Sequence, residues 1–345
     1  MSTVHTTWPD HTGLEPSASQ EGLVEFSAVI PTKDRPADLC RVLSALLHQT
    51  LLPEEIIIID QSCSDECASA VAALYGSRSA ALPRLVYVHD SSIDGLTAAR
   101  NEGLRRSAAS VVVYLDDDGI PHQDALLLLL QALRTHPDLL AVGGVITTYA
   151  PPSRLSLLAQ KVFYRGPFWD ERQPVYWNWS RYAPGEIIPT TKLNGGLSAF
   201  RREALVAIGG FDGRYRGASV GEDVEVSQRL LRHAGYPTAL ALVGGAWLAH
   251  ESRGQWKSGQ RSLEFQMVAA HYLLSRSLPR TALNTLRFYW AVLGMLAIAS
   301  VASVRRRTLG PIRSILDGLR SIWTGYANCP FLKPESPEGK AVDAR

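Results

Sequence analysis

The sequence predicts an α/β domain with a mostly parallel sheet flanked by helices, followed by a helical extension toward the C-terminal end. Short apolar runs alternate with segments of helical periodicity through the first half of the chain, a pattern typical of βαβ units. Residues 56–59 are four consecutive isoleucines, which suits a strand buried on both faces. Ligands of such sheets bind beyond the carboxyl ends of the strands, so a site is expected along that edge.

The individual elements follow from local periodicity. The expected strands share apolar or β-branched runs, and they cover residues 26–30, 55–60, 85–88, 110–115, 139–147, 193–200 and 238–242. The expected helices share an apolar repeat of three to four residues, and they cover residues 39–47, 68–75, 96–106, 125–134, 202–208 and 222–234. Residues 150–192 are rich in Pro and aromatic side chains and lack clear periodicity, so no element is assigned there.

The two ends of the chain differ from the expected domain. Residues 1–25 are polar and contain no apolar signal segment, so they are interpreted as a flexible leader. Residues 288–304 are 17 residues without a charge, the lower limit for a membrane span. Because many of them are Ala, Ser or Gly, an interfacial or packed helix is favoured over a true span.

The charge is close to balanced overall but uneven along the chain. The 345 residues carry a formal net charge of +2, with hydrophobic and charged fractions ordinary for a globular protein. Between His271 and Arg320, however, eight arginines accompany one acid, Asp317. This excess suits anionic lipid head groups or a solvated basic face, and nucleic acid is disfavoured because an apolar segment lies beside it. The four cysteines form no disulfide framework, which indicates reduced thiols.

Polar clusters follow three of the expected strands, at residues 31–35, 60–62 and 116–118. Asp116, Asp117 and Asp118 repel one another unless water screens them or a cation neutralises them. Hard divalent ions such as Mg²⁺ or Mn²⁺ bind both carboxylate and phosphate oxygens, so this cluster suits a metal diphosphate; an acidic surface turn is the alternative. Asp60 suits hydrogen bonding to a base or ribose, or capping of the next helix.

Four other positions each have two interpretations. Arg100 suits bidentate phosphate binding or an exposed helical position. Glu222 and Asp223 begin a helix, where they complement its dipole or serve as a general base. His250 suits a metal ligand or a buried, hydrogen-bonded histidine.

Aromatic residues concentrate between residues 163 and 182 and include Trp177 and Trp179. Aromatic faces stack on sugar rings, and the same composition suits a membrane interface or a satellite core.

Together these pieces resemble family 2 glycosyltransferases, which have a Rossmann-like GT-A fold, over about residues 26–250. The segments that carry the resemblance, in chain order, are residues 29–35, 58–62, 98–103 (an A-R-N-x-G motif), 115–118 (a D-x-D motif), 194–196, 209–212 and 221–223. Gln61 is a departure, since the family more often has an acid or Asn there. The Q-x-x-R-W signature of processive synthases is missing, because Gln255-Trp256 does not reproduce it, so addition of a single sugar is expected.

The resemblance implies roles for individual residues. Nucleotide-sugar binding is expected of Pro31, Thr32, Asp34, Arg35, Asp60, Arg100, Asp116 and Asp117. A divalent metal, Mg or Mn, is expected on Asp118, with His250 as a second candidate ligand. Asp223 is expected to be the catalytic base with Glu222 beside it. Trp177, Trp179, Gly195 and Gly196 are expected on the acceptor side.

The implied activity is inverting transfer of a sugar from a nucleoside-diphosphate sugar to a hydroxyl of a glycan or lipid-linked acceptor, as in cell-surface glycan or glycolipid synthesis. The alternative is a non-catalytic, membrane-associated binding protein with the same fold. A nucleotidyltransferase or dehydrogenase is disfavoured, because residues 31–36 contain no glycine for a phosphate loop. The expected location is cytoplasmic and peripheral on the inner face of the membrane.

The expected organisation has four parts. The transferase domain covers residues 26–250, with a nucleotide-binding half at 26–118 and an acceptor half at 119–250. A basic helical extension covers residues 251–325, and residues 326–345 are expected to be a flexible tail.

Overall fold

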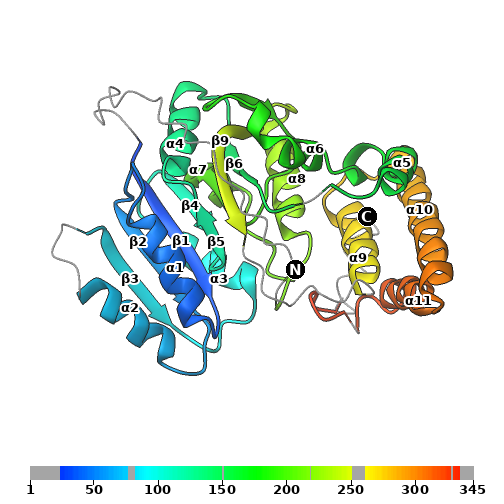
Figure 1. Cartoon of the computed structure of the whole chain (residues 1–345), viewed down its shortest axis with the longest axis horizontal. Coiled ribbons are helices and arrows are strands. Elements are labelled where there is room, and N and C mark those ends of the chain that lie inside the picture. Colours follow the sequence, from blue (N-terminus) through cyan, green and yellow to red (C-terminus); the bar gives the residue numbers. More distant parts are fainter. Residues whose placement is uncertain are drawn as a thin grey trace, which may run out of the picture.

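The computed structural model describes residues 24–76, 82–149, 151–217, 219–250, 261–327 and 329–334. Figure 1 shows a sheet domain at one end of the molecule and a group of helices at the other. Nearly all of the expected leader and the Gln255-Trp256 pair lie outside the described residues.

One mixed sheet contains the nine strands of the described residues, in the order β3-β2-β1-β4-β8-β6-β9-β5, and β7 pairs with β9. The pairings β3-β2, β2-β1, β1-β4 and β6-β9 are parallel, whereas β8, β5 and β7 pair antiparallel to their neighbours. The strands are β1 Phe26–Thr32, β2 Glu55–Asp60, β3 Arg84–His89, β4 Val111–Leu115, β5 Gly119–Pro121, β6 Ala141–Ile146, β7 Ile187–Pro189, β8 Leu197–Arg201 and β9 Leu240–His250. The predicted parallel pairing therefore holds for the first four strands along the sheet.

Helices cover both faces of this sheet because the central strands are apolar on both sides. All four isoleucines of β2 are fully buried, and alternate ones belong to the two opposite cores. Helices α1 Pro36–Leu46, α2 Glu66–Gly76 and α4 Ala125–Thr135 contribute to one core, and α3 Leu96–Arg106, α7 Arg202–Ala207 and α8 Glu222–Ala234 to the other. The α/β sandwich expected from the sequence is confirmed.

The segment without periodicity contains short elements that the sequence pattern did not predict. They are α5 Arg154–Phe163, α6 Arg172–Trp177, the 3-10 turns η1 Gly166–Phe168 and η2 Trp179–Arg181, and strand β7. Helix α5 packs against α10 rather than on the sheet, so long-range contacts hold it in place. Local periodicity does not report such contacts.

The C-terminal helices form a bundle beside the sheet domain (Figure 1). They are α9 Arg261–Arg276, α10 Ala282–Arg306 and α11 Gly310–Trp323, and their shared core contains Met267, Phe288, Val292, Met295, Ala299 and Ile315. Among the described helices, α10 is the one long and apolar enough to cross a membrane by length and composition.

Of the expected flexible tail, residues 326–327 and 329–334 are packed against the rest of the molecule, and the remainder lies outside the described residues. Tyr326, Cys329, Phe331 and Leu332 are buried in a core with Tyr215 and Tyr272. Leu332 also forms an antiparallel bridge with Tyr215. These contacts join residues 326–327 and 329–334 both to the loop that contains Tyr215 and to α9.

Candidate functional site

The acidic triplet lies where β4 ends, next to the end of β9. Strand β5 pairs with β9, and Gly119 lies opposite His250 in this pairing. The imidazole of His250 therefore lies next to the aspartates that precede Gly119. His250 Nε2 lies 3.0 Å from Asp118 Oδ1 and 3.8 Å from Asp116 Oδ2. The ligand atoms of Asp116, Asp118 and His250 all lie within 4.8 Å of one another.

These three side chains fit a divalent cation. Carboxylate oxygens and imidazole nitrogen are ligands that Mn²⁺ accepts, and Mg²⁺ accepts the carboxylate oxygens. The carboxylates of Asp116 and Asp118 beside the ring raise the pKa of His250 to about 10, which favours the protonated imidazole between them. A bound metal ion displaces such a proton, since it requires neutral imidazole. The cluster contains Asp116 as well as the two ligands expected from the sequence.

Asp117 turns away from this cluster toward the loop after β1. Its Oδ2 accepts a hydrogen bond from Thr32 Oγ1 at 2.8 Å, and its Oδ1 lies 2.9 Å from Arg35 Nη1. The same Arg35 nitrogen lies 3.2 Å from Asp118 Oδ2. Burial raises the pKa of Asp117 to about 6 in spite of the Arg35 charge. The polar clusters at residues 31–35 and 116–118 are thus in contact, as the parallel pairing of β1 with β4 predicts.

The polar cluster at residues 60–62 lies at the same edge of the sheet, but the side chain of Asp60 is buried there. Asp60 is fully buried, and its carboxylate accepts hydrogen bonds from the Ser62 amide at 2.9 Å and the Tyr87 hydroxyl at 2.5 Å. The amide of Asp34 donates to Ser62 Oγ at 2.7 Å, which ties the loop after Pro31 to the end of β2. Asp60 therefore shapes this edge from within, and its contact with a base stays a prediction.

Arg100 bridges the acidic cluster and the start of α8. Its guanidinium donates to Asp116 Oδ1, Glu222 Oε1 and the Gly195 carbonyl oxygen, each at 3.0 Å. A Cβ at Gly195 would lie 2.6 Å from Arg100 Nη2, so a larger residue there would displace the guanidinium. The side chain is only 1% exposed and its guanidinium is already bound by two carboxylates, and its contact with a phosphate stays a prediction. Arg100 thus links the carboxylate of Asp116, after β4, to that of Glu222, at the start of α8.

Glu222 and Asp223 begin α8 but have different partners. Burial and the neighbouring Asp223 raise the pKa of Glu222 to about 7, while Arg100 favours its charged form. Asp223 Oδ2 accepts from Arg172 Nη1 at 2.7 Å, and its Oδ1 accepts from the Val224 amide at 2.8 Å.

Arg172 is the residue at this site that sequence reasoning missed. Its guanidinium also binds both oxygens of Asp170, at 2.8 and 2.9 Å, and the Leu193 carbonyl oxygen. Burial alone would raise the pKa of Asp170, but Arg172 outweighs it and holds that pKa at about 2. Asp170 and Arg172 lie in the segment without periodicity. The one sequence signal for a functional role there was the concentration of aromatic residues between positions 163 and 182.

A cavity of about 550 Å³ brings these groups together. Seven residues of its lining belong to the expected set: Asp116, Trp177, Gly195, Gly196, Glu222, Asp223 and His250. Residues that were not expected also line it, among them Tyr149, Gln160, Asp170 and Arg172. Trp179 is not part of this lining, since its ring packs 5.5 Å from that of Trp247. The packing of Trp179 against Trp247 explains why it does not line the cavity as Trp177 does.

A model of the family described as glycosyl transferase family 2 matches residues 27–207, more than half of the chain. The chain belongs to glycosyl transferase family 2. The match covers β1 to β8 with the acidic triplet and the Gly195-Gly196 pair, and Glu222, Asp223 and His250 follow it.

Curated relatives are glycosyltransferases. The chain is 34% identical over 95 residues to the uncharacterized glycosyltransferase YwdF of Bacillus subtilis, covering 28% of this chain and 33% of the relative. It is 29% identical over 218 residues to the galactofuranosyltransferase GlfT1 of Mycobacterium tuberculosis, covering 62% of this chain and 67% of the relative. The chain thus spans between one third and two thirds of the lengths of these relatives.

Solved structures share the GT-A fold. The mannosyltransferase PcManGT of Pyrobaculum calidifontis, in complex with GDP-Man and Mn²⁺, matches with a TM-score of 0.57 at 16% identity, covering 88% of both chains. GalNAc-T7 with UDP, GalNAc and Mn²⁺ matches with a TM-score of 0.53 at 16% identity, covering 82% of this chain and 58% of that one. At these identities the likeness concerns the fold.

Proposed function

We propose that this chain is an inverting, metal-dependent glycosyltransferase that moves a single sugar from a nucleoside-diphosphate sugar to a hydroxyl of a glycan or lipid-linked acceptor. One observation carries the proposal. Asp116, His250 and Asp223 line the same cavity, so a candidate cation site and a candidate base face one space.

The donor end of the cavity is the acidic edge of the sheet. Asp116, Asp118 and His250 would hold Mg²⁺ or Mn²⁺, which when bound neutralises the charge of a diphosphate leaving group. Thr32 and Arg35 fix Asp117 behind these ligands and keep it from turning into the cavity. Pro31, Asp34 and Asp60 are candidates for contacts with the nucleoside of the donor.

The acceptor end is the start of α8. Asp223 takes the proton of the attacking hydroxyl, and its second oxygen is held by Arg172. A single base without an enzyme nucleophile leads to inversion at the anomeric carbon, by the logic that governs glycosidases. Trp177 lines this end and offers a ring face to a sugar.

Other features support the finer parts of the proposal. The relatives and neighbours named above include sugar transferases, two of them crystallised with nucleotide or nucleotide sugar and Mn²⁺. The missing Q-x-x-R-W signature supports transfer of one sugar per encounter. We assign residues 26–118 to donor binding, 119–250 to the acceptor half and 251–325 to a helical extension, and we place the enzyme in the cytoplasm.

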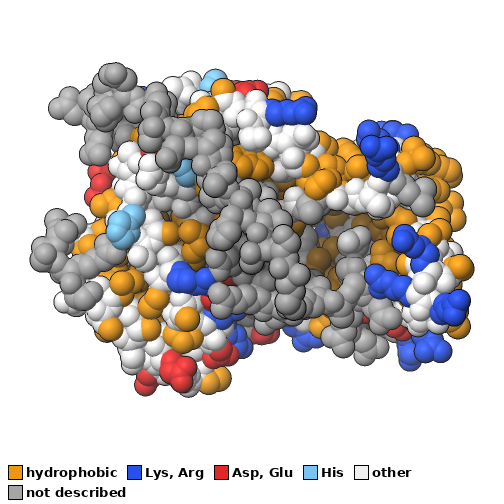
Figure 2. Space-filling view, in the orientation of Figure 1, with side chains coloured by type: hydrophobic (Ala, Val, Ile, Leu, Met, Phe, Trp, Pro, Cys, Tyr) orange, Lys and Arg blue, Asp and Glu red, His pale blue; other side chains and the backbone are white. Residues whose placement is uncertain are grey.

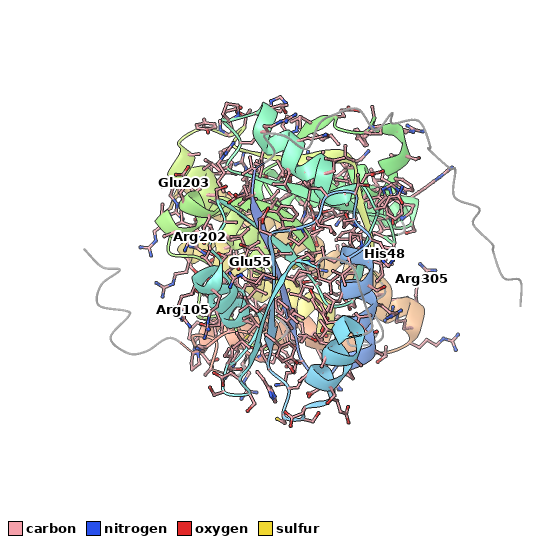
Figure 3. All side chains as sticks on the ribbon, turned by 90° about the vertical axis from the view of Figure 1, so that its left-hand side faces the viewer. His48, Glu55, Arg105, Arg202, Glu203 and Arg305 are labelled. Carbon is pink, nitrogen blue, oxygen red and sulfur yellow. The ribbon has the colours of Figure 1, made fainter. Side chains whose placement is uncertain are left out.

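Calorimetry with a panel of nucleoside diphosphates tests the proposal. We expect one nucleotide to bind the wild type in Mn²⁺, and the binding to disappear with a chelator and in Asp118→Ala. Asp223→Asn should bind that nucleotide within about twofold but transfer at least about 10²-fold less radiolabelled sugar from the matching donor to a lipid and glycan fraction. Glu203→Gln, an exposed acid on α7 (Figure 3), is the control that leaves both unchanged.

The outcomes separate the competing functions. Near-normal transfer by Asp223→Asn would reject this residue as the base while leaving the donor site intact. Binding of no nucleotide under any metal condition would instead favour the alternative of a non-catalytic binding protein.

A further inference from the structure

The outward face of α10 is apolar, and most of its large side chains are exposed. Its inward face packs Phe288, Val292 and Met295 against α9 and α11. Its outward side chains recur at helical spacing and include Leu286, Tyr289, Trp290, Leu293, Val301 and Val304, of which Val304 is 78% exposed. A helix on the surface of a water-soluble domain normally presents polar side chains outward. This face therefore suits an apolar environment.

Neighbouring helices extend the same face. On α5, Leu158 and Val162 are exposed, and the Val162 carbonyl oxygen accepts a hydrogen bond from Trp290 Nε1 at 2.9 Å. At the other end of α10, the exposed apolar residues are Leu309, Leu316, Leu319 and Trp323, the last 90% exposed. We call this surface of α5, α10 and α11 the apolar face. Contiguous apolar surfaces of this kind mark contacts with a partner or a membrane.

Unpaired cations border the apolar face. None of the arginines at the end of α10 and along α11 forms an ion pair with a carboxylate in the described residues; they are Arg305, Arg306, Arg307, Arg313 and Arg320. Figure 2 shows Lys and Arg side chains among hydrophobic ones at this end of the molecule.

Arginines on the opposite side of the molecule are bound by the protein itself. In Figure 3, Arg105 and Arg202 lie on the side away from Arg305. Arg105 pairs with Glu102, and Arg202 donates to the Ser107 carbonyl oxygen. The five arginines beside the apolar face thus differ from Arg105, which has a carboxylate partner.

A cationic hollow opens beside α10. This cavity of about 400 Å³ is lined by Lys161, Val162, Tyr164, Arg165, Gly166 and Trp169, with no acidic side chain in its lining. The guanidinium of Arg287, on α10, lies against Gly166, where an ideal Cβ would meet it at 2.9 Å. Ammonium and guanidinium groups around an aromatic-lined hollow suit a phosphate carried on an apolar tail.

We propose that the apolar face docks on an anionic lipid bilayer, with the outward residues of α10 in the interfacial layer and the cationic hollow on a lipid phosphate. Docking leaves the contacts of α10 with α9 and α11 intact, whereas a span would remove Phe288 and Met295 from their shared core. A second copy of the chain is a poorer occupant. A two-fold contact through this face would bring the same unpaired arginines together.

Co-sedimentation of the full chain with vesicles tests the docking, and it requires neither donor nor acceptor. The wild type should bind phosphatidylcholine vesicles that contain phosphatidylglycerol, and bind pure phosphatidylcholine vesicles at least about tenfold more weakly. Leu286→Glu with Leu293→Glu should weaken binding to the anionic vesicles by about tenfold or more, since both side chains are exposed and acids are costly in the interface. Val206→Glu, on an exposed apolar position of α7, is the matched control and should bind as the wild type does.

The hollow has its own variant. Lys161→Glu with Arg165→Glu should lose the preference for anionic vesicles, whereas Arg134→Glu, an exposed position on α4, should keep it. Circular dichroism and the melting temperature identify any variant that fails to fold, and quenching of Trp323 by brominated lipid, compared with Trp323→Phe, then reports contact directly.

Each other outcome overturns the docking proposal. Equal binding to neutral and anionic vesicles removes the cations and the cationic hollow from lipid recognition, and no effect of the α10 variants removes the apolar face from membrane contact. Resistance of membrane-bound wild type to alkaline extraction indicates a span. A dimer in solution that the same variants dissociate, without any vesicle binding, indicates a second copy.

Discussion

At the scale of single residues, the notable feature of the site is that both candidate catalytic carboxylates are bound by buried arginines. Arg100 binds Glu222, and Arg172 binds Asp223. Arg172 is in turn fixed by Asp170, so the base is held by a chain of charges from a neighbouring segment. An arginine beside a carboxylate favours its charged form and fixes its direction. Arg172 is therefore a positioning residue.

Arg172→Met should lower kcat by about 10²-fold, because Asp223 loses its fixed direction toward the acceptor. Arg172→Lys should recover part of this loss, since one cation is restored without the fork to Asp170. Nucleotide binding measured by calorimetry should stay within about twofold in both variants, and Arg134→Met should resemble the wild type. An equal loss of nucleotide affinity would show that Arg172 supports the fold of the site rather than the base.

At the scale of elements, the contact between α5 and α10 connects the cavity to the helical bundle. A Cβ at Gly294 would lie 2.3 Å from the Cβ of Phe163, so α10 approaches α5 closely only because it has glycine there. The Phe163 and Trp290 rings lie 5.2 Å apart across the same contact. Since α5 also contributes Gln160 to the cavity, bundle packing sets one cavity wall.

Gly294→Ala should reduce the free energy of unfolding by about 1–3 kcal/mol, the usual cost of inserting a methyl group into a filled contact. Amide hydrogen exchange should also rise in residues 154–163. Gly76→Ala is the control, because nothing lies within 4 Å of an ideal Cβ there, and alanine is the better helix former. Faster exchange spread over the sheet, instead of α5, would contradict a local effect.

At the scale of the whole molecule, the described C-terminal residues close onto the loop before α8. The amide of Arg216 donates to the Phe331 carbonyl oxygen at 3.1 Å, and the amide of Lys333 donates to the Arg214 carbonyl oxygen at 2.8 Å. That loop leads into Gly221, which has a positive φ of 84° and begins the turn of α8 that carries Asp223. The chain end thus supports the candidate base from a distance in sequence.

A chain ending at residue 325 should unfold at a lower temperature than one ending at residue 334. The shorter chain loses the buried Phe331 and Leu332, and removing a buried large side chain costs about 2–5 kcal/mol. The chain ending at residue 334 keeps the contacts of Phe331 and Leu332 and is therefore the matched reference. Differential scanning calorimetry on the two chains measures the difference, and equal melting temperatures would mean that these contacts contribute little.

The sequence predicted those features whose cause is local. The bounds of α3 and α8 agree with the expected residues 96–106 and 222–234, because capping glycines and apolar periodicity define both. The convergence of the strand-end clusters followed from parallel topology. The contacts of Arg100 with Asp116 and Glu222, and of Arg172 with Asp223, were not predictable from one chain, since they join residues 16 to 122 positions apart through packing.

The thickness of helix α5 sets the distance between the cavity and the apolar face. Gln160 lines the cavity, and Leu158 and Val162, two residues away on either side, are exposed on the apolar face, so opposite sides of one helix serve both. A helix with its side chains is about 10 Å across, so a docked enzyme would hold the attacked hydroxyl about that far above the lipid surface. This geometry selects acceptors by the length of their head groups, and confinement to one plane raises the effective concentration of those that match.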